Sequence, residues 1–106
     1  MFARVVTLLR ELREMLISAD QHAYTGEIDT ALSGDDAALV AFLTSNTLWG
    51  GAGSIADEAC GESRETRRPV EQLLAMLGRE QLRLGYANPR TEMWTSTFEH
   101  WYTQNI

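Results

Sequence analysis

Residues 5–19, VVTLLRELREMLISA, decide the fold because their apolar side chains recur with the spacing of an α-helix. The apolar positions 5, 8, 9, 12, 15, 16 and 19 follow the pattern of a helix that buries one face. On the opposite face, Arg10 and Glu14 lie one turn apart, and we expect them to form an ion pair. The sequence therefore predicts an amphipathic helix from Phe2 to about Ala23.

Two shorter helices are predicted to follow. Thr25-Gly26 interrupts the chain, and Glu27–Leu32 has a weak helical pattern. Either Asp35 or Asp36 can cap the next helix, because a carboxylate accepts hydrogen bonds from free backbone N–H groups. That helix, from Ala37 to about Thr44, is nearly all apolar, so we expect it in the middle of the core. A buried strand is the alternative for so short an apolar run.

The most distinctive local feature is the glycine-rich segment WGGAG, residues 49–53, which predicts a loop because glycine permits positive φ and close backbone approach. A short helix, Ser54–Cys60, is expected to follow, with Ser54 as its N-cap and a capping-box carboxylate three residues on. The loop has two interpretations, an anion-binding cradle or a structural connection with the tryptophan packed beneath it. The structural one is favoured, because acidic residues follow where an anion would sit. The candidate binding residues are Trp49, Gly50, Gly51, Gly53, Ser54 and Asp57.

A second long helix is predicted after the polar connection Glu62–Arg68. Thr66 is suited to the N-cap of this helix, Pro69 is suited to its first turn, and Gly85 is suited to its end. The apolar stripe of this helix consists of Val70, Leu73, Leu74, Leu77 and Leu84. The connection also holds a basic cluster, Arg64, Arg67 and Arg68. Glutamates interleave with these arginines, which favours a salt-linked surface over contact with an acidic partner.

A last helix is predicted after Asn88-Pro89, and it carries an aromatic stripe. The stripe consists of Trp94, Phe98, Trp101 and Tyr102. We expect it to be mostly core, and if the protein binds a partner, this helix is the first candidate interface.

Together these patterns predict an all-α fold in which residues 1–106 form a single domain. It would contain four main helices and one or two short ones, arranged around Phe42. No segment alternates with the period of a β-strand.

Composition excludes several classes of function. The net charge of −6 argues against a nucleic-acid partner and against docking on an anionic membrane. The longest apolar run, Ala37–Leu43, is too short to span a bilayer, and no signal-peptide pattern opens the chain. The single cysteine, Cys60, cannot form an intramolecular disulfide, so we expect a cytoplasmic protein. The absence of lysine is typical of a GC-rich bacterial genome.

No catalytic or metal-binding constellation is evident. Cys60 is a possible nucleophile with His22 or His100 as its base, but it lies at a helix C-terminus, where the dipole disfavours a thiolate. The two histidines are far apart in the chain and no metal-ligand spacing occurs. We therefore expect no catalytic residue, no metal and no cofactor, and a protein that is not an enzyme.

Three segments carry a resemblance to known proteins: Ser33–Asp36, the apolar helix through Phe42-Leu43, and GGAGSIAD at 50–57. They resemble a group of small bacterial helical proteins of unknown function with a Gly-Gly-x-Gly-Ser-[apolar]-x-Asp segment. The resemblance implies a helical fold and a bacterial source, and it implies no activity.

The sequence thus favours an acidic, non-enzymatic protein–protein interaction module, either a homodimer or the binder of another protein. Immunity proteins and antitoxins, which mask basic partners, are analogous in charge and size only. The alternative is a small-molecule or anion-binding module that uses the Trp49–Asp57 loop together with the arginine cluster.

Overall fold

The computed structural model describes all 106 residues as six helices with no strand, which confirms the predicted all-α fold. The helices are α1 (Ala3–Ser18), α2 (Thr25–Ser33), α3 (Asp36–Leu43), α4 (Ile55–Cys60), α5 (Arg64–Leu84) and α6 (Thr91–Thr103). None of them is both long enough and apolar enough to cross a membrane. The radius of gyration, 12.5 Å, is that expected of one compact body of this length.

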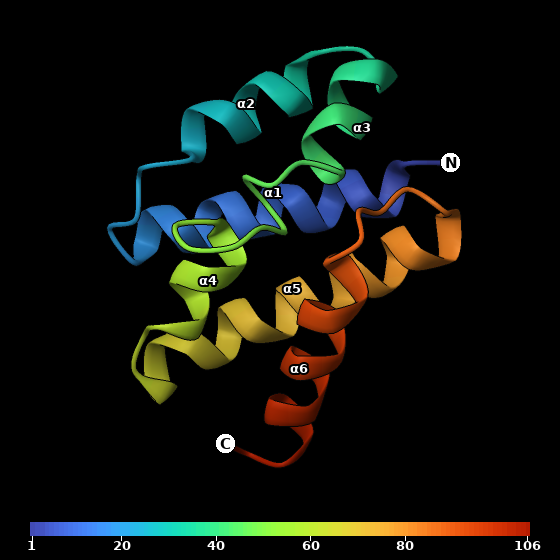
Figure 1. Ribbon diagram of the computed structural model, residues 1–106. Helices are drawn as coiled ribbons and strands as arrows, with labels where there is room; N and C mark the ends of the chain where they lie inside the picture. The colour runs from blue at the N-terminus through green and yellow to red at the C-terminus, as the bar shows by residue number, and fades with distance from the viewer.

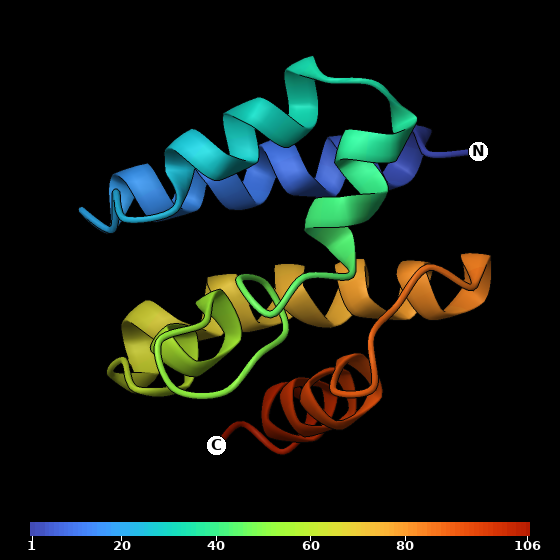
Figure 2. The ribbon, with the colours of Figure 1, turned by 45° about the horizontal axis from the view of Figure 1, so that its top comes forward.

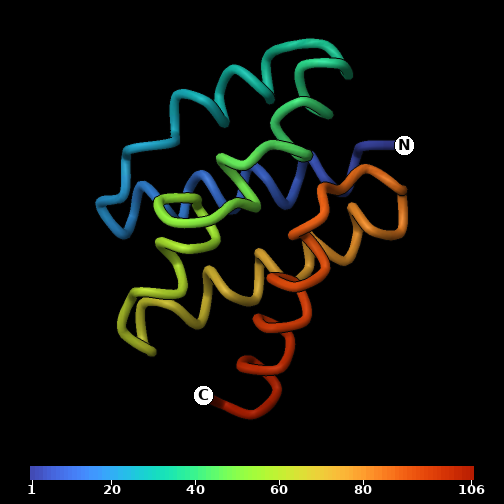
Figure 3. The backbone as a smooth tube through the Cα atoms, viewed as in Figure 1, coloured from blue at the N-terminus to red at the C-terminus, as the bar shows by residue number.

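The helices stack in the order α2, α1, α5, α6 (Figures 1 and 2). Helix α2 returns along α1, α5 lies on the other side of α1, and α6 crosses the far side of α5. The short helix α4 lies at the start of α5. Between α3 and α4 the chain makes a long irregular connection, residues 44–54, which is conspicuous in the backbone trace (Figure 3).

Helix α1 buries the predicted apolar stripe. Its buried residues are Val5, Leu8, Leu9, Leu12 and Leu16. The ion pair that Arg10 and Glu14 could form is absent, and Arg13 is instead the residue that faces α2. Arg13 pairs there with Asp29, and also with Glu14 at 2.9 Å.

Helix α1 also ends earlier than the predicted Ala23, because Asp20 adopts a left-handed conformation with φ of 58°. The N–H groups of Asp20 and Gln21 donate to the carbonyls of Ile17 and Leu16, which is the pattern of a Schellman motif. Gly85 and Asn105 end α5 and α6 in the same way, with φ of 83° and 59°. Glycine, asparagine and aspartate are the residues that tolerate this conformation best.

Helix α3 is capped as predicted, since the Asp35 side chain accepts from the Ala38 N–H at 2.9 Å. Its predicted place in the middle of the core is wrong. Leu39 and Leu43 are buried, but Ala37 and Ala41 are exposed. The helix covers one side of the core, and Ala37 and Ala41 face water.

Helix α5 begins at Arg64, inside the predicted polar connection, because Ser63 rather than Thr66 is its N-cap. Pro69 therefore lies inside the helix rather than in its first turn. A proline there leaves the carbonyl of the residue four positions earlier, Glu65, without a helical partner. Both residues are exposed, so this interruption lies on the water-facing side of α5.

Candidate functional site

The connection between α3 and α4 is held in place by side chains from distant parts of the chain. The Trp94 indole N–H donates to the Gly50 carbonyl at 2.9 Å, and the Tyr24 hydroxyl donates to the Gly53 carbonyl. Trp49 is fully buried beneath the connection. The structural interpretation of this loop is therefore the one that its contacts support.

The three glycines of the loop have different conformational roles. Only Gly53 has a positive φ, 86°. A Cβ on Gly50 would lie 2.1 Å from the Asn46 carbonyl oxygen, so this position requires glycine for close backbone approach. A Cβ on Gly51 would meet only the flexible end of the Arg90 side chain. The structure thus uses positive φ at Gly53 and close backbone approach at Gly50, the two properties for which glycine was expected here, and requires neither at Gly51.

The backbone N–H groups of Gly53 and of the start of α4 are already engaged within the protein. Ser54 is the predicted N-cap, and its hydroxyl accepts from the Asp57 N–H at 3.1 Å. The Asp57 carboxylate accepts from Gly53 at 2.9 Å, one residue before the position expected of a capping box. The N–H groups of Ile55 and Ala56 donate to carbonyls of the connection itself. The start of α4 therefore offers no free N–H group to an anion, and Asp57 and Glu58 place two carboxylates in its first turn.

Two amide side chains that the sequence reasoning missed, one buried and one half-buried, hold this region together. Gln81 is fully buried, accepts from the Trp49 indole N–H at 2.9 Å, and donates to the carbonyls of Leu43 and Tyr86. Asn88 donates to the carbonyl of Trp49 at 2.8 Å and to two carbonyls at the end of α3. One signal was available in the sequence: Gln81 follows Leu74 and Leu77 on the buried face of α5.

The predicted arginine cluster binds the end of α6. Arg67 pairs with the buried Glu71 at 2.9 Å, and its guanidinium lies 5.0 Å from the ring centre of Trp101. Arg68 donates to the Tyr102 carbonyl and lies over its ring at 4.6 Å. Neither arginine is bonded to the glycine loop, so the structure does not join the two parts of the predicted anion site. Arg64 is exposed and makes no ion pair.

The aromatic stripe of α6 packs mostly on α5 and on the glycine loop. Phe98 is fully buried and lies between Trp94 and Trp101, with ring centres at 5.6 and 6.0 Å. Both tryptophans are half-buried against the core. Tyr102, at 37% exposed, is the most exposed member of the stripe. Met93, on the same helix, is 52% exposed.

The candidate catalytic residues are not brought together by any hydrogen bond. Cys60 is half-buried at the end of α4, and neither histidine is bonded to it. His22 instead lies 2.8 Å from the Asp20 carboxylate at the turn between α1 and α2.

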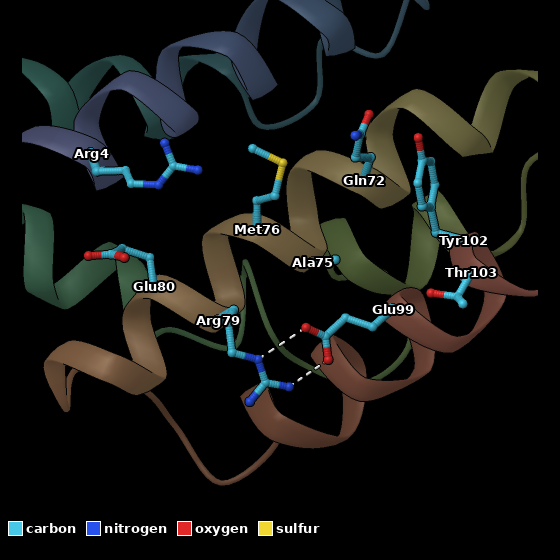
Figure 4. Close-up of a pocket in the computed structure, with 9 residues that line it drawn as sticks. All are labelled: Arg4, Gln72, Ala75, Met76, Arg79, Glu80, Glu99, Tyr102 and Thr103. Carbon is cyan, nitrogen blue, oxygen red and sulfur yellow. Dashed lines mark hydrogen bonds and ion pairs between the residues drawn. The ribbon is translucent and has the colours of Figure 1, made fainter.

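Two surface cavities remain, and they differ in charge balance. The first, of about 520 Å³, lies between α1, α5 and α6 and is shown in Figure 4. Arg79 and Glu99 are paired across it, and hydrogen bonding to Glu99 raises the pKa of Arg79. Glu80 is paired with Arg83, whose hydrogen bond lowers the pKa of the Glu80 carboxyl. The carboxylates of this cavity are therefore neutralised by arginines of the same chain.

The second cavity, of about 560 Å³, lies between the end of α1, the α1–α2 turn and α4, and we call it the α1–α4 cavity. The buried apolar side chains of Leu16 and Ile55 contribute to its wall. The carboxylates of Asp20, Glu58 and Glu62 also line it. No arginine pairs with any of these three carboxylates.

The chain matches no protein-family model, and comparison with curated proteins and with solved structures finds no match. The resemblance to small helical proteins with a glycine-rich segment stays a prediction.

Proposed function

We propose that this chain is a non-enzymatic interaction module that binds a basic protein through its acidic portion. The supporting observation is the division of charge along the sequence. Residues 14–63 contain nine acidic residues and no arginine or lysine. All nine arginines lie outside this segment, together with the other six acidic residues. The segment thus has a formal charge of −9 and the remainder +3.

The fold presents this segment to water on α2, α3 and α4. Its exposed acidic residues include Glu27, Asp35, Asp36 and Glu58. Two other acidic residues of this segment, Glu14 and Asp29, are paired with Arg13. Most of the arginines are occupied within the chain. Those with an ion pair or a hydrogen bond to another residue are Arg13, Arg67, Arg68, Arg79 and Arg83.

A surface with one sign of charge and few counter-charges attracts partners of the opposite sign and speeds their association. The same charge repels nucleic-acid phosphates and a second copy of the acidic surface. A basic protein therefore fits this surface better than a homodimer does. A homodimer would have to use α6, where Met93 and Tyr102 are exposed.

A direct test measures the affinity of the protein for an arginine-rich peptide and for a glutamate-rich peptide of equal length. We expect binding of the arginine-rich peptide alone, and weaker binding as salt is added. The variant Glu27→Gln/Asp36→Asn should bind more weakly than the wild type. A matched control, Glu11→Gln/Glu65→Gln, removes two exposed charges outside residues 14–63 and should bind nearly as well as the wild type. Equal losses in the two variants would contradict the proposal.

Sedimentation of the free protein tests the homodimer reading separately. We expect the wild type to sediment as a monomer. If it is a dimer, and Met93→Glu dissociates that dimer, self-association through α6 would be favoured instead.

A further inference from the structure

We infer that the α1–α4 cavity receives an arginine side chain of the basic partner. This inference rests on the proposed function and gives it a specific anchoring site. The cavity has a volume of about 560 Å³, within the usual range for sites that enclose a ligand group.

The composition of the wall fits both parts of an arginine side chain. Leu16, Ile55 and Ala23 contribute apolar atoms to the wall, against which the methylene stem can lie. The carboxylates of Glu58 and Glu62 can accept hydrogen bonds from the planar guanidinium, whose fork of donors matches carboxylate oxygens. Tyr24 also lines the cavity and adds an aromatic surface, on which guanidinium groups stack.

The carboxylates of the cavity lack a cationic partner from this chain. Glu58 makes no side-chain hydrogen bond or ion pair, and Glu62 accepts only from the amide of Gln21. Asp20 has only His22 as its partner. The cavity between α5 and α6 is different, because Arg79 and Arg83 already neutralise its carboxylates. Charge complementarity therefore points to the α1–α4 cavity as the one that needs an external cation.

The spacing of these groups favours an organic cation over a metal ion. A metal ion requires several ligands converging on one point, and no three histidine, cysteine, aspartate or glutamate side chains form such a group. A guanidinium is broad enough to contact carboxylates that do not converge.

The test is an NMR titration of the isotopically labelled protein with a Gly-Ser peptide that carries a single arginine. Shift changes should centre on Tyr24, Ile55 and Glu58. A peptide with citrulline, which is neutral and nearly the same shape, should bind at least tenfold more weakly, since a hydrogen bond to a charged group is worth about 1.5–3 kcal/mol. A peptide in which a single methylene joins the guanidinium to the backbone should also bind more weakly than the arginine peptide, because so short a stem cannot cover the apolar wall.

The variant Glu58→Gln should weaken arginine binding about tenfold, whereas Glu27→Gln, an equal change of charge on α2, should weaken it less than twofold. Because Glu58 has no hydrogen-bond partner, its substitution is expected to leave the fold intact, which a circular dichroism spectrum checks. Equal losses in the two variants, or shift changes confined to α2 and α3, would overturn the inference but leave the proposed function standing. Failure of the wild type to bind any arginine-rich peptide would overturn the proposed function itself.

Discussion

Replacement of Gln81 by methionine should destabilise the protein more than the same replacement at an exposed glutamine of α5. Methionine is close to glutamine in length and shape, so the change removes hydrogen bonds without creating a large cavity. Three partners would lose their bonds: the buried indole N–H of Trp49, at 2.9 Å, the buried carbonyl of Leu43, at 2.8 Å, and the half-buried carbonyl of Tyr86, at 2.9 Å.

The size of the effect follows from those three bonds. An unsatisfied buried polar group costs about 1–3 kcal/mol, and the burial of an apolar side chain in place of an amide offsets part of that loss. We expect the free energy of unfolding to fall by about 3 kcal/mol. Domains of this size are stable by about 5–15 kcal/mol, so Gln81→Met should lower the melting temperature by at least about 10 °C and still fold.

Urea denaturation followed by circular dichroism measures the effect, with Gln72→Met as the control on an exposed position of the same helix. A double-mutant cycle with Trp49→Phe isolates the indole–amide bond, since the double variant lacks both partners. We expect the double variant to lose less stability than the two single variants summed. If Gln81→Met costs less than about 1 kcal/mol relative to the control, the buried amide does not hold the connection together.

Three further predictions concern single positions. Gly53→Ala should lower the free energy of unfolding by about 1–2 kcal/mol, because the φ of Gly53 is 86°. Gly51→Ala should lower it by less than half as much. Equal losses of the two variants in urea denaturation would refute this prediction. Gly78→Ala should destabilise the protein by about 1–3 kcal/mol, although alanine favours helices, because its Cβ would lie 1.9 Å from the Thr95 hydroxyl. Adding Thr95→Ala should partly restore the stability. A Gly78→Ala variant more stable than the wild type would contradict the close crossing of α5 and α6. Arg83 lowers the pKa of the Glu80 carboxyl. The pair therefore stabilises the folded protein fully above the usual glutamate pKa of about 4.3, and this stabilisation is lost as the pH falls through the lower pKa that Glu80 has in the folded protein. Glu80→Gln should therefore reduce thermal stability at neutral pH but have no effect at strongly acidic pH, and a deficit that persists in acid would show that the pair does not cause it.

The parts of the fold that depend on local sequence were predictable. The apolar stripe of α1 and the caps Asp35 and Ser54 follow from residues within one or two turns, and the structure confirms them. The end of α1 was missed because Asp20 takes a conformation that is usually assigned to glycine.

The position of α3 and the role of Gln81 were missed for another reason. Both depend on which segments meet in space, and the partners of Gln81 include Leu43, 38 residues earlier. A glutamine in a long polar helix reads as a surface residue unless its register with the buried leucines is considered.

The candidate site was only partly predictable. The division of charge along the chain can be read from the sequence, and the net negative charge of the sequence already suggested a basic partner. The α1–α4 cavity could not be predicted, because Leu16 and Ile55 line the same space only after α4 has docked beside the end of α1.

The distant hydrogen bonds of the α3–α4 connection also constrain the order in which the chain can fold. Helices α1, α2 and α3 are neighbours in sequence and can begin to pair early, since such contacts close short loops. Besides the bond from Tyr24, the connection receives side-chain bonds from Gln81, Asn88 and Trp94, up to 44 residues downstream. During synthesis, which proceeds from the N-terminus, the middle of this chain must therefore stay unfinished until nearly the last helix has been made.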